Sequence, residues 1–355
     1  MNEKLPNVVS VIGCPRSGTT LMQAQLARHF DLSAISETHY IFLFSKYLWL
    51  WRNLKDKKNR LGLIKALQDF TKIRWGIISG YNLEKVRQIS ILESIEKVEQ
   101  LADGSGDYKN LINDIYRVHA KIKGSAGVIE KFSYYSPVDI EFLSTLLPET
   151  KFIHVIRDGR DVSLSWRKTW FGPKSVLKSA LLWQKHVTLY ADWGRRNPSR
   201  YLEINFSDII ENEYEVLDEI SKFIRMPLQE SSFKNNNVFA VLAEKEHYKK
   251  SKSSPDKEFQ LKWPLEMEEK HKKLFMKVAG RSLTKYGFED LMLKDDKQTI
   301  FVFAWEILKE IKEFFFGKIT WKRRAFSIFP LVIKISQILN ISLYQTLSLK
   351  KKNNR

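Results

Sequence analysis

The sequence predicts an α/β fold in which helices flank a central parallel sheet. Residues 8–12 and 151–156 are rich in aliphatic side chains, as are strands that a parallel sheet buries on both faces. A glycine-bounded loop follows the first of these stretches and leads into a segment whose apolar residues recur at helical spacing. A strand, a loop and a helix in this order form the repeating unit of such sheets.

The loop at residues 13–20 has the spacing of a phosphate-binding loop. Gly13 and Gly18 are separated by four residues, and a helix is expected to begin at about Thr19. Backbone N–H groups converge at a helix N-terminus and the helix dipole adds partial positive charge, so the loop suits an anion. The predicted sheet is therefore of the P-loop type.

One position separates this loop from that of nucleotide triphosphatases. Thr19 stands where those proteins carry the lysine that reaches the β- and γ-phosphates, and the positive side chain lies earlier, at Arg16. We therefore expect the loop to hold a phosphate of a nucleotide that is not a triphosphate.

Between the first loop and the second strand pattern, the sequence predicts a helical insertion at about residues 41–125. Residues 34–36 are expected to end a short strand before it, which places Glu37 at the carboxyl end of a strand, where parallel sheets bind ligands. After the insertion, residues 127–130 form another predicted strand that leads to Lys131. The helices should cover the ligand side of the sheet.

The string PRSGTTL at residues 15–21 resembles the 5′-phosphosulfate loop of sulfotransferases that use 3′-phosphoadenosine 5′-phosphosulfate (PAPS). The stretch 151–166, a strand followed by RDGRDVSLSW, is similar to the family's second phosphate element. The resemblance implies that Arg157 and Ser165 bind the 3′-phosphate, and Arg167 is expected to add to the phosphate or adenine site. It implies that the 5′-phosphosulfate is bound by the loop residues Arg16, Ser17, Gly18, Thr19, Thr20 and Leu21.

The resemblance extends over roughly residues 7–290, with a gap at 45–125. Residues 201–228 resemble a strand and helix of the family, and 262–263 with 279–288 resemble its C-terminal signature. We therefore expect one sulfotransferase domain at residues 1–295, followed by a helical C-terminal extension at 296–355.

Glu37 is the expected general base. A Glu-Thr step stands at the same distance from the loop in tyrosylprotein sulfotransferases, where the glutamate is the proposed base, and a carboxylate in a partly dry cleft can take a proton. His39 is the alternative, because cytosolic sulfotransferases use a histidine. Lys131 either reaches the sulfuryl group or acceptor, or is a solvated strand end, and Arg16 is expected to meet charge on the leaving group.

Composition indicates the partners. The chain has 355 residues and a formal net charge of +18, which predicts anionic partners such as PAPS, lipid head groups or acidic acceptors. No motif for reading nucleic acid accompanies this charge, so nucleic acid is not expected. The seven histidines are scattered and no metal is expected. A single cysteine, Cys14, and the lack of a signal-peptide pattern predict a cytoplasmic location.

Residues 301–355 carry eleven Lys or Arg and three Asp or Glu. Their apolar stretch, 325–349, is interrupted by Pro330 and Lys334 and is a poor membrane span. A basic amphipathic segment lying on an anionic membrane surface is one interpretation. A pair of helices packed on the domain is the other.

The expected function is transfer of a sulfuryl group from PAPS to an acceptor hydroxyl. A carbohydrate acceptor is favoured, a glycolipid if the extension binds membrane, and peptidyl tyrosine remains open because of Glu37. One alternative is a kinase-like phosphotransferase, which would need a lysine at position 19 and an acidic residue after a hydrophobic strand. The other is a non-catalytic basic protein that binds membranes.

Overall fold

The computed structural model describes residues 7–100, 106–133, 139–169, 172–229, 238–239, 261–288, 302, 304–308, 328–339, 342–345 and 347. Within them a single sheet is built from five strands, which are β1 (Asn7–Ile12), β2 (Leu32–Ala34), β3 (Gly127–Phe132), β4 (Lys151–Ile156) and β5 (Tyr201–Asn205). Their order is β2-β3-β1-β4-β5, and every neighbouring pair is parallel. The predicted α/β fold with a central parallel sheet is confirmed.

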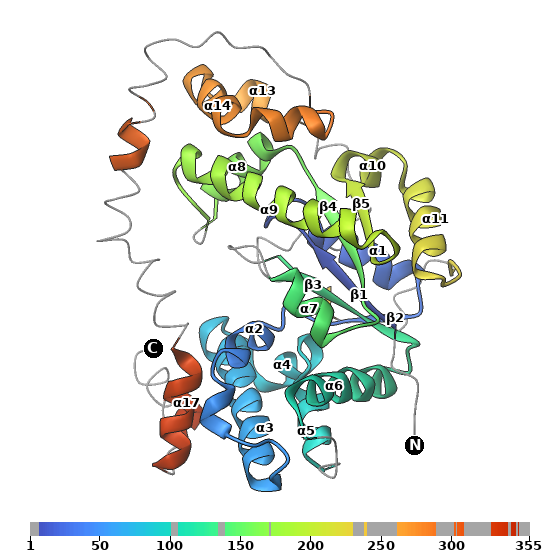
Figure 1. Cartoon of the computed structure of the whole chain (residues 1–355), viewed down its shortest axis with the longest axis vertical. Helices are drawn as coiled ribbons and strands as arrows, with labels where there is room; N and C mark the ends of the chain where they lie inside the picture. The colour runs from blue at the N-terminus through green and yellow to red at the C-terminus, as the bar shows by residue number, and fades with distance from the viewer. Residues whose placement is uncertain are drawn as a thin grey trace.

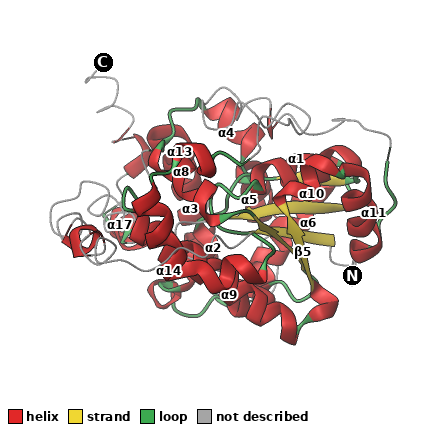
Figure 2. Ribbon diagram, turned by 90° about the horizontal axis from the view of Figure 1, so that it is seen from above, coloured by secondary structure: helices red, strands yellow, loops and turns green. Residues whose placement is uncertain are grey.

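Alternate side chains of β1 enter two different cores, one on each face of the sheet. Val9 and Val11 belong to a core shared with α1 (Thr19–His29), α10 (Phe206–Glu211) and α11 (Glu213–Ile224). Val8 and Ile12 belong to the opposite core, shared with α6 (Tyr108–Lys123), α7 (Ile140–Leu146) and α9 (Val176–Arg196). The sheet thus lies between helical layers (Figures 1 and 2), and its ligand-binding edge is the one where the parallel strands end.

The secondary-structure elements that the structure describes between β2 and β3 are all helices joined by short loops, in the stretch for which the sequence predicts an insertion. Figure 1 shows its helices in blue to teal, gathered beyond one side of the sheet. Besides α6, they are α2 (Tyr40–Ser45), the 3₁₀-helix η1 (Leu48–Trp51), α3 (Lys57–Thr71), the π-helix η2 (Lys72–Ile78), α4 (Leu83–Ile89) and α5 (Leu92–Gln100).

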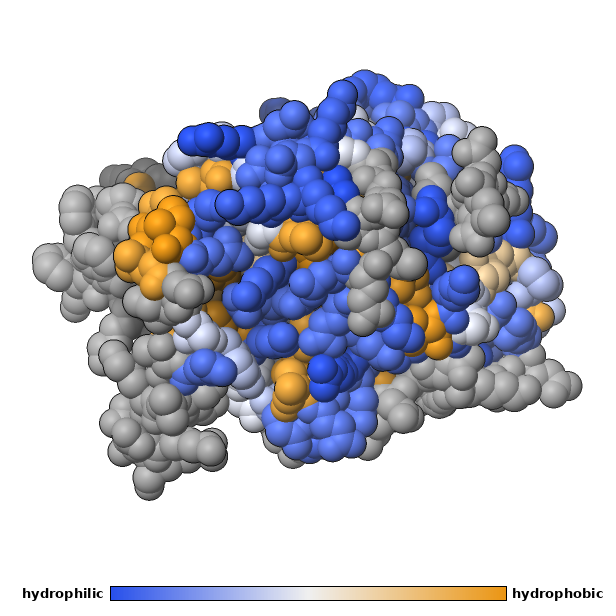
Figure 3. Space-filling view, turned by 90° about the horizontal axis from the view of Figure 1, so that it is seen from below, coloured by the Kyte–Doolittle hydropathy of each residue, from blue (hydrophilic) through white to orange (hydrophobic). Residues whose placement is uncertain are grey.

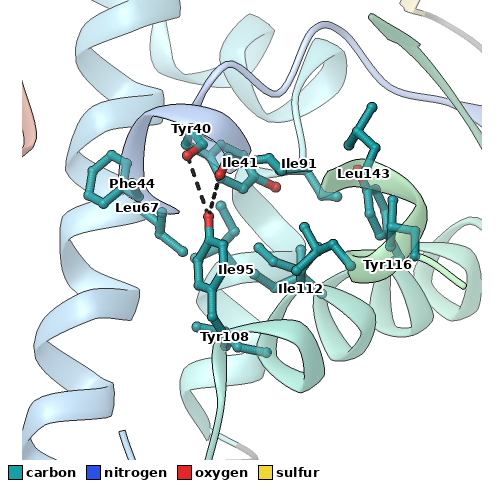
Figure 4. Packing of buried hydrophobic residues seen from close by; sticks show 14 of the residues in the cluster. Tyr40, Ile41, Phe44, Leu67, Ile91, Ile95, Tyr108, Ile112, Tyr116 and Leu143 are labelled. Carbon is teal, nitrogen blue, oxygen red and sulfur yellow. Dashed lines mark hydrogen bonds between the residues drawn. The ribbon is translucent and has the colours of Figure 1, made fainter. Parts of the chain in front are cut away.

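Tyr108 fastens the start of α2 to α6. Its buried hydroxyl donates to the carbonyl oxygens of Ile41, at 3.0 Å, and Tyr40, at 3.4 Å, within an apolar cluster (Figure 4). Burial raises the pKa of Tyr108, so the group stays a hydroxyl donor at physiological pH. This contact fixes the segment that follows Glu37 and therefore helps to position the site.

The second half of the chain packs three helices around α8 (Gly159–Arg167), the helix that follows β4. These are α9, α13 (Trp263–Glu266) and α14 (Glu269–Lys285), and all four helices lie on one side of the sheet (Figure 1). Asp161 of α8 accepts from the backbone N–H groups of Lys262 and Trp263, both at 2.9 Å. The guanidinium carbon of Arg160 stacks 3.5 Å from the centroid of Trp263. Residues 262–263, which are distant in sequence, are thereby held against α8, the helix that carries Ser165. A short 3₁₀-helix, η3 (Pro198–Arg200), precedes β5.

Helix α17 (Phe329–Ile338) packs one side on α3. Ile333 is fully buried, and the side-chain amide of Gln337 donates to the carbonyl oxygen of Gly62 at 2.9 Å. No helix in the described part of the chain combines the length and apolarity needed to cross a bilayer. Most of the predicted extension at 296–355 lies outside the described residues.

Candidate active site

The phosphate-binding loop joins β1 to α1, which begins at Thr19 as the sequence predicts. Ser17 N donates to the carbonyl oxygen of Cys14 at 3.0 Å, and Arg16 and Gly18 have φ of 78° and 95°. A Cβ atom at Gly18 would lie 2.2 Å from the ring of Phe206, so only glycine fits there. Burial raises the pKa of the Cys14 thiol, which therefore remains protonated.

The loop presents a set of hydrogen-bond donors that matches an oxoanion. The backbone N–H groups of residues 18–21 open α1, and in the described structure they meet no protein acceptor. The buried hydroxyl of Ser17 likewise has no partner among the described residues. Buried polar groups are normally satisfied, so donors that converge without acceptors fit a phosphate or sulfate group.

The second phosphate element follows β4. Arg157 is mostly buried, its guanidinium carbon lies 4.6 Å from the ring centroid of Phe206, and its Nη2 lies 3.5 Å from a carboxylate oxygen of Asp161. Burial lowers the pKa of Arg157 and Asp161 opposes this, and a guanidinium remains a cation at physiological pH. Trp183 Nε1 donates to the carbonyl oxygen of Arg157 at 2.9 Å and fixes the backbone there.

The structure brings the two phosphate elements into direct contact. Arg16 Nε in the loop donates to Ser165 Oγ on α8 at 3.0 Å, across 149 positions of sequence. Phe206 contacts both elements, because the ring that excludes a side chain at Gly18 also lies under Arg157. Residues of both elements therefore lie next to one another at the ends of β1 and β4.

Arg167 is not brought to this site. It lies two residues beyond Ser165 on α8, which is about 200° around the helix, and its side chain is exposed. Its charge influences Glu268 and His271 at the start of α14 instead.

The expected catalytic residues Glu37, His39 and Lys131 lie together, beside the loop. Lys131 Nζ lies 2.8 Å from Oε1 of Glu37 and donates to Thr20 Oγ1 at 3.1 Å. The other carboxylate oxygen of Glu37 lies 3.1 Å from His39 Nε2. A continuous set of contacts thus leads from the first turn of α1 to Glu37 and His39.

Charge and burial set the protonation states of this pair. Burial alone would raise the pKa of Glu37, but the Lys131 ammonium and the hydrogen bond from His39 lower it below its ordinary value. Burial lowers the pKa of His39, and the charge of Arg74 adds to this. At neutral pH Glu37 is therefore a carboxylate and His39 a neutral imidazole.

Two further side chains at this site, those of Arg74 and Glu130, are not predicted from the sequence. Arg74, on η2, places Nη2 3.4 Å from His39 Nε2 and lines a small pocket together with Glu37, His39 and Trp75. No sequence motif marks Arg74, because it lies in the helical insertion. Glu130 is fully buried in β3. Its place as a charged residue within an apolar strand pattern is the sequence signal that could have identified it.

Glu130 holds the segment that carries Glu37. Its Oε1 accepts from the backbone N–H of Thr38, at 3.1 Å, and from the Thr38 hydroxyl. Burial raises the pKa of Glu130 well above its ordinary value, so this carboxyl is neutral. Neighbouring residues of the segment after β2 therefore bind neighbouring residues of β3, since Glu37 pairs with Lys131 and Thr38 with Glu130.

Both strands beside β1 supply a cation to this edge. Lys131 comes from β3 and Arg157 follows β4. The described residues contain no group of three or more His, Cys, Asp or Glu placed to hold a metal ion. The donor set thus matches anionic groups.

Comparison with known proteins places the chain in a family. The sequence matches the family model described as "Sulfotransferase family" over residues 7–230. Among curated proteins no match was found.

Several solved structures are similar. The sulfotransferase domain of the olefin synthase from Synechococcus PCC 7002 shares 20% identity with a TM-score of 0.50, over 82% of this chain and 98% of that domain. The sulfotransferase domain from the curacin biosynthetic pathway shares 16% identity with a TM-score of 0.42, over 85% and 98%. Mouse sulfotransferase SULT7A1, complexed with PAP, shares 11% identity with a TM-score of 0.42, over 81% and 90%.

The similarity to the olefin synthase domain supports the fold alone. The family model covers more than half of the sequence and includes the loop, Arg157 and Ser165. The chain therefore belongs to the sulfotransferase family.

Proposed function

We propose that this sulfotransferase takes the sulfuryl group from PAPS and transfers it to an acceptor hydroxyl, with Glu37 as the general base. The observation that carries the proposal is the hydrogen bond between Arg16 and Ser165, because two phosphate elements in contact suit the two ends of a single nucleotide. The loop amides and Ser17 would hold the 5′-phosphosulfate, and Arg157 with Ser165 the 3′-phosphate.

The cations around the loop favour a bisphosphate nucleotide over a magnesium triphosphate. Thr19 replaces the lysine of nucleotide triphosphatases, and the strands beside β1 present Lys131 and Arg157 where an acidic magnesium ligand would be needed. Asn205, at the end of β5, is likewise not acidic. These residues support a sulfotransferase and give no support to the kinase-like alternative.

PAPS supplies the sulfuryl group, and adenosine 3′,5′-bisphosphate (PAP) is the leaving group. The acceptor oxygen forms a bond to sulfur while the bond from sulfur to the 5′-phosphate oxygen breaks. Glu37 takes the proton of the acceptor hydroxyl. Arg16, the N–H groups of residues 18–21 and the hydroxyls of Thr19 and Thr20 stabilise the charge that develops on the 5′-phosphate.

Lys131 links the strength of the base to the presence of the nucleotide. In the structure its ammonium holds Glu37 as a weak base, and the same ammonium touches Thr20 at the loop. Negative charge bound at the loop competes for Lys131, and this raises the pKa of Glu37 towards the range in which a carboxylate accepts a proton. Lys131 then faces the sulfuryl oxygens.

His39 is the second candidate for the base. As a neutral imidazole it has the right protonation state, but its Nε2 is directed at Glu37. We propose that His39 orients the carboxylate by donating to it.

Sulfuryl transfer is tested with radiolabelled PAPS and three acceptor classes: carbohydrates, glycolipids and tyrosine peptides. We expect label in one class, with carbohydrate or glycolipid favoured, and we expect no transfer of labelled phosphate from ATP with magnesium. Phosphate transfer from ATP without sulfuryl transfer from PAPS would contradict the proposal.

We further propose that the protein is cytoplasmic and reaches an anionic membrane surface through α17. The outer side of this helix bears an apolar stripe at helical spacing, in which Ile328, Ile335, Ile338 and Leu339 are between 47% and 72% exposed. Figure 3 shows an orange area on the left of the molecule, the side on which α17 lies in Figure 1. Exposed apolar stripes of this kind mark interaction surfaces, and the net charge of +18 favours an anionic one.

Replacing Ile335 and Ile338 together by serine should weaken binding to vesicles of phosphatidylglycerol and phosphatidylcholine by about tenfold or more, because two apolar side chains no longer enter the interface. Co-sedimentation measures the effect. The matched control replaces Leu181 and Leu189, which are exposed on α9, by serine. Equal binding by both variants, or equal binding to vesicles without phosphatidylglycerol, would contradict this role of α17.

A further inference from the structure

Arg74 places a guanidinium beside the proposed base, on the side away from the phosphate loop. The set of contacts that starts at Thr20 passes through Lys131, Glu37 and His39 and ends at Arg74, whose Nη2 lies 3.4 Å from His39 Nε2. Because the nucleotide would occupy the Thr20 end, an acceptor must approach Glu37 from the Arg74 end.

Two neighbours hold this guanidinium in place. Nη1 donates to Ser79 Oγ at 2.7 Å, and the guanidinium carbon lies 4.9 Å from the ring centroid of Trp75. All three residues belong to η2 or directly follow it, and π-helical turns are frequently found at functional sites. The charge is therefore fixed in the lining of the pocket that Glu37 also lines.

The charge of Arg74 is not neutralised by an acid. Among the described residues no carboxylate lies within ion-pair distance of Arg74, and Glu96, on the adjacent helix α5, is engaged by Lys72 and Arg87. Glu37 is held in the ion pair with the ammonium described above. A half-buried cation without a counter-charge costs free energy, and a ligand oxoanion would remove that cost.

The tautomer of His39 determines whether its ring can accept a hydrogen bond from Arg74. Nε2 of His39 faces both Glu37, at 3.1 Å, and Arg74, at 3.4 Å. A single ring nitrogen cannot donate to the carboxylate and accept from the guanidinium at the same time. With the proton on Nε2, which the hydrogen bond to Glu37 requires, Nη2 of Arg74 has no acceptor on the ring.

We propose that the acceptor carries an oxoanion, a carboxylate or a phosphate, close to the hydroxyl that receives the sulfuryl group, and that Arg74 binds it. This inference rests on the proposed function and names the acceptor class within it. A guanidinium forms two parallel hydrogen bonds to such a group and keeps its charge at any physiological pH. Acidic sugars and phosphate-bearing lipid head groups both satisfy this chemistry.

The test compares charged and uncharged forms of the same acceptor. Methyl galacturonide is compared with its uncharged methyl ester, and glycerol 1-phosphate with glycerol, which separates a carboxylate from a phosphate source. Binding to the PAP-saturated protein is measured by calorimetry, and transfer from PAPS by kcat and KM. We expect tighter binding of at least one charged form, and we expect Arg74→Gln to remove this preference with a rise of about 30-fold or more in KM.

Three outcomes decide the inference. Equal binding of charged and uncharged forms by the wild-type protein overturns it, and so does an equal loss for both forms in Arg74→Gln, which would make Arg74 a positioning residue for His39. Recovery of the preference in Arg74→Lys supports it. Failure of PAP to bind, or of PAPS to serve as donor with any acceptor, would instead reject the proposed function, so the two failures are distinguishable.

Discussion

Replacing Glu37 by glutamine is expected to lower kcat for sulfuryl transfer by about 10²–10⁴-fold, the usual contribution of a general base. Glutamine keeps the shape of the side chain but cannot take the acceptor proton. Affinity for PAP should be retained, because in the described part of the chain Glu37 reaches the loop through Lys131 and makes no direct contact with it. Steady-state kinetics with PAPS measure the first effect and calorimetric titration with PAP the second.

His39→Gln is the matched control, since it removes the imidazole and leaves the carboxylate. A smaller loss of kcat than in Glu37→Gln is expected. The pH profile of kcat/KM, which reports groups of the free enzyme, is a further check: a base loses activity as pH falls through its pKa, and in the nucleotide-free protein Lys131 holds the pKa of Glu37 below its ordinary value. Retained turnover in Glu37→Gln, with a loss of activity in His39→Gln, would move the base to His39.

Arg157→Ala is expected to weaken PAP binding by about 10²-fold or more, because it removes a buried guanidinium that would face the 3′-phosphate. The fold should survive, since Asp161 keeps its hydrogen bonds from the backbone of Lys262 and Trp263. Calorimetric titration with PAP measures the affinity and thermal unfolding checks the fold.

Arg167→Ala makes the same change of charge ten residues further along the chain. Its side chain is exposed and is directed away from Ser165, so PAP affinity should stay near that of the wild-type protein. An equal loss of affinity in both variants would indicate a general effect of net charge and would contradict a specific role for Arg157.

The sequence predicted the sheet, and the strands and loop on which both proposed phosphate elements lie, because the signals for these elements are local. Apolar runs identify β1 and β4, and the glycine spacing locates the start of α1 at Thr19. Residues at the carboxyl ends of neighbouring strands in a parallel sheet lie at the same edge. The predicted topology therefore places Arg16 and Arg157 near each other.

The contacts that complete the site depend on residues far apart in sequence, and no local pattern encodes them. Phe206 lies between Gly18 and Arg157 only because β5 pairs with β4 and ends beside them. Arg74 reaches His39 through the packing of the helical insertion, whose arrangement apolar spacing does not determine. Thr38 meets Glu130 because β2 lies beside β3 at the edge of the sheet.

The central claim is that one nucleotide contacts both phosphate elements. Calorimetric titration of the wild-type protein and of Arg157→Ala with PAP and with adenosine 5′-monophosphate tests it most directly, because the two nucleotides differ only in the 3′-phosphate. We predict that the wild-type protein binds PAP far more tightly, that Arg157→Ala removes most of this difference, and that affinity for the monophosphate is unchanged. Equal affinity of the wild-type protein for both nucleotides, or an equal loss for both in Arg157→Ala, would contradict the claim.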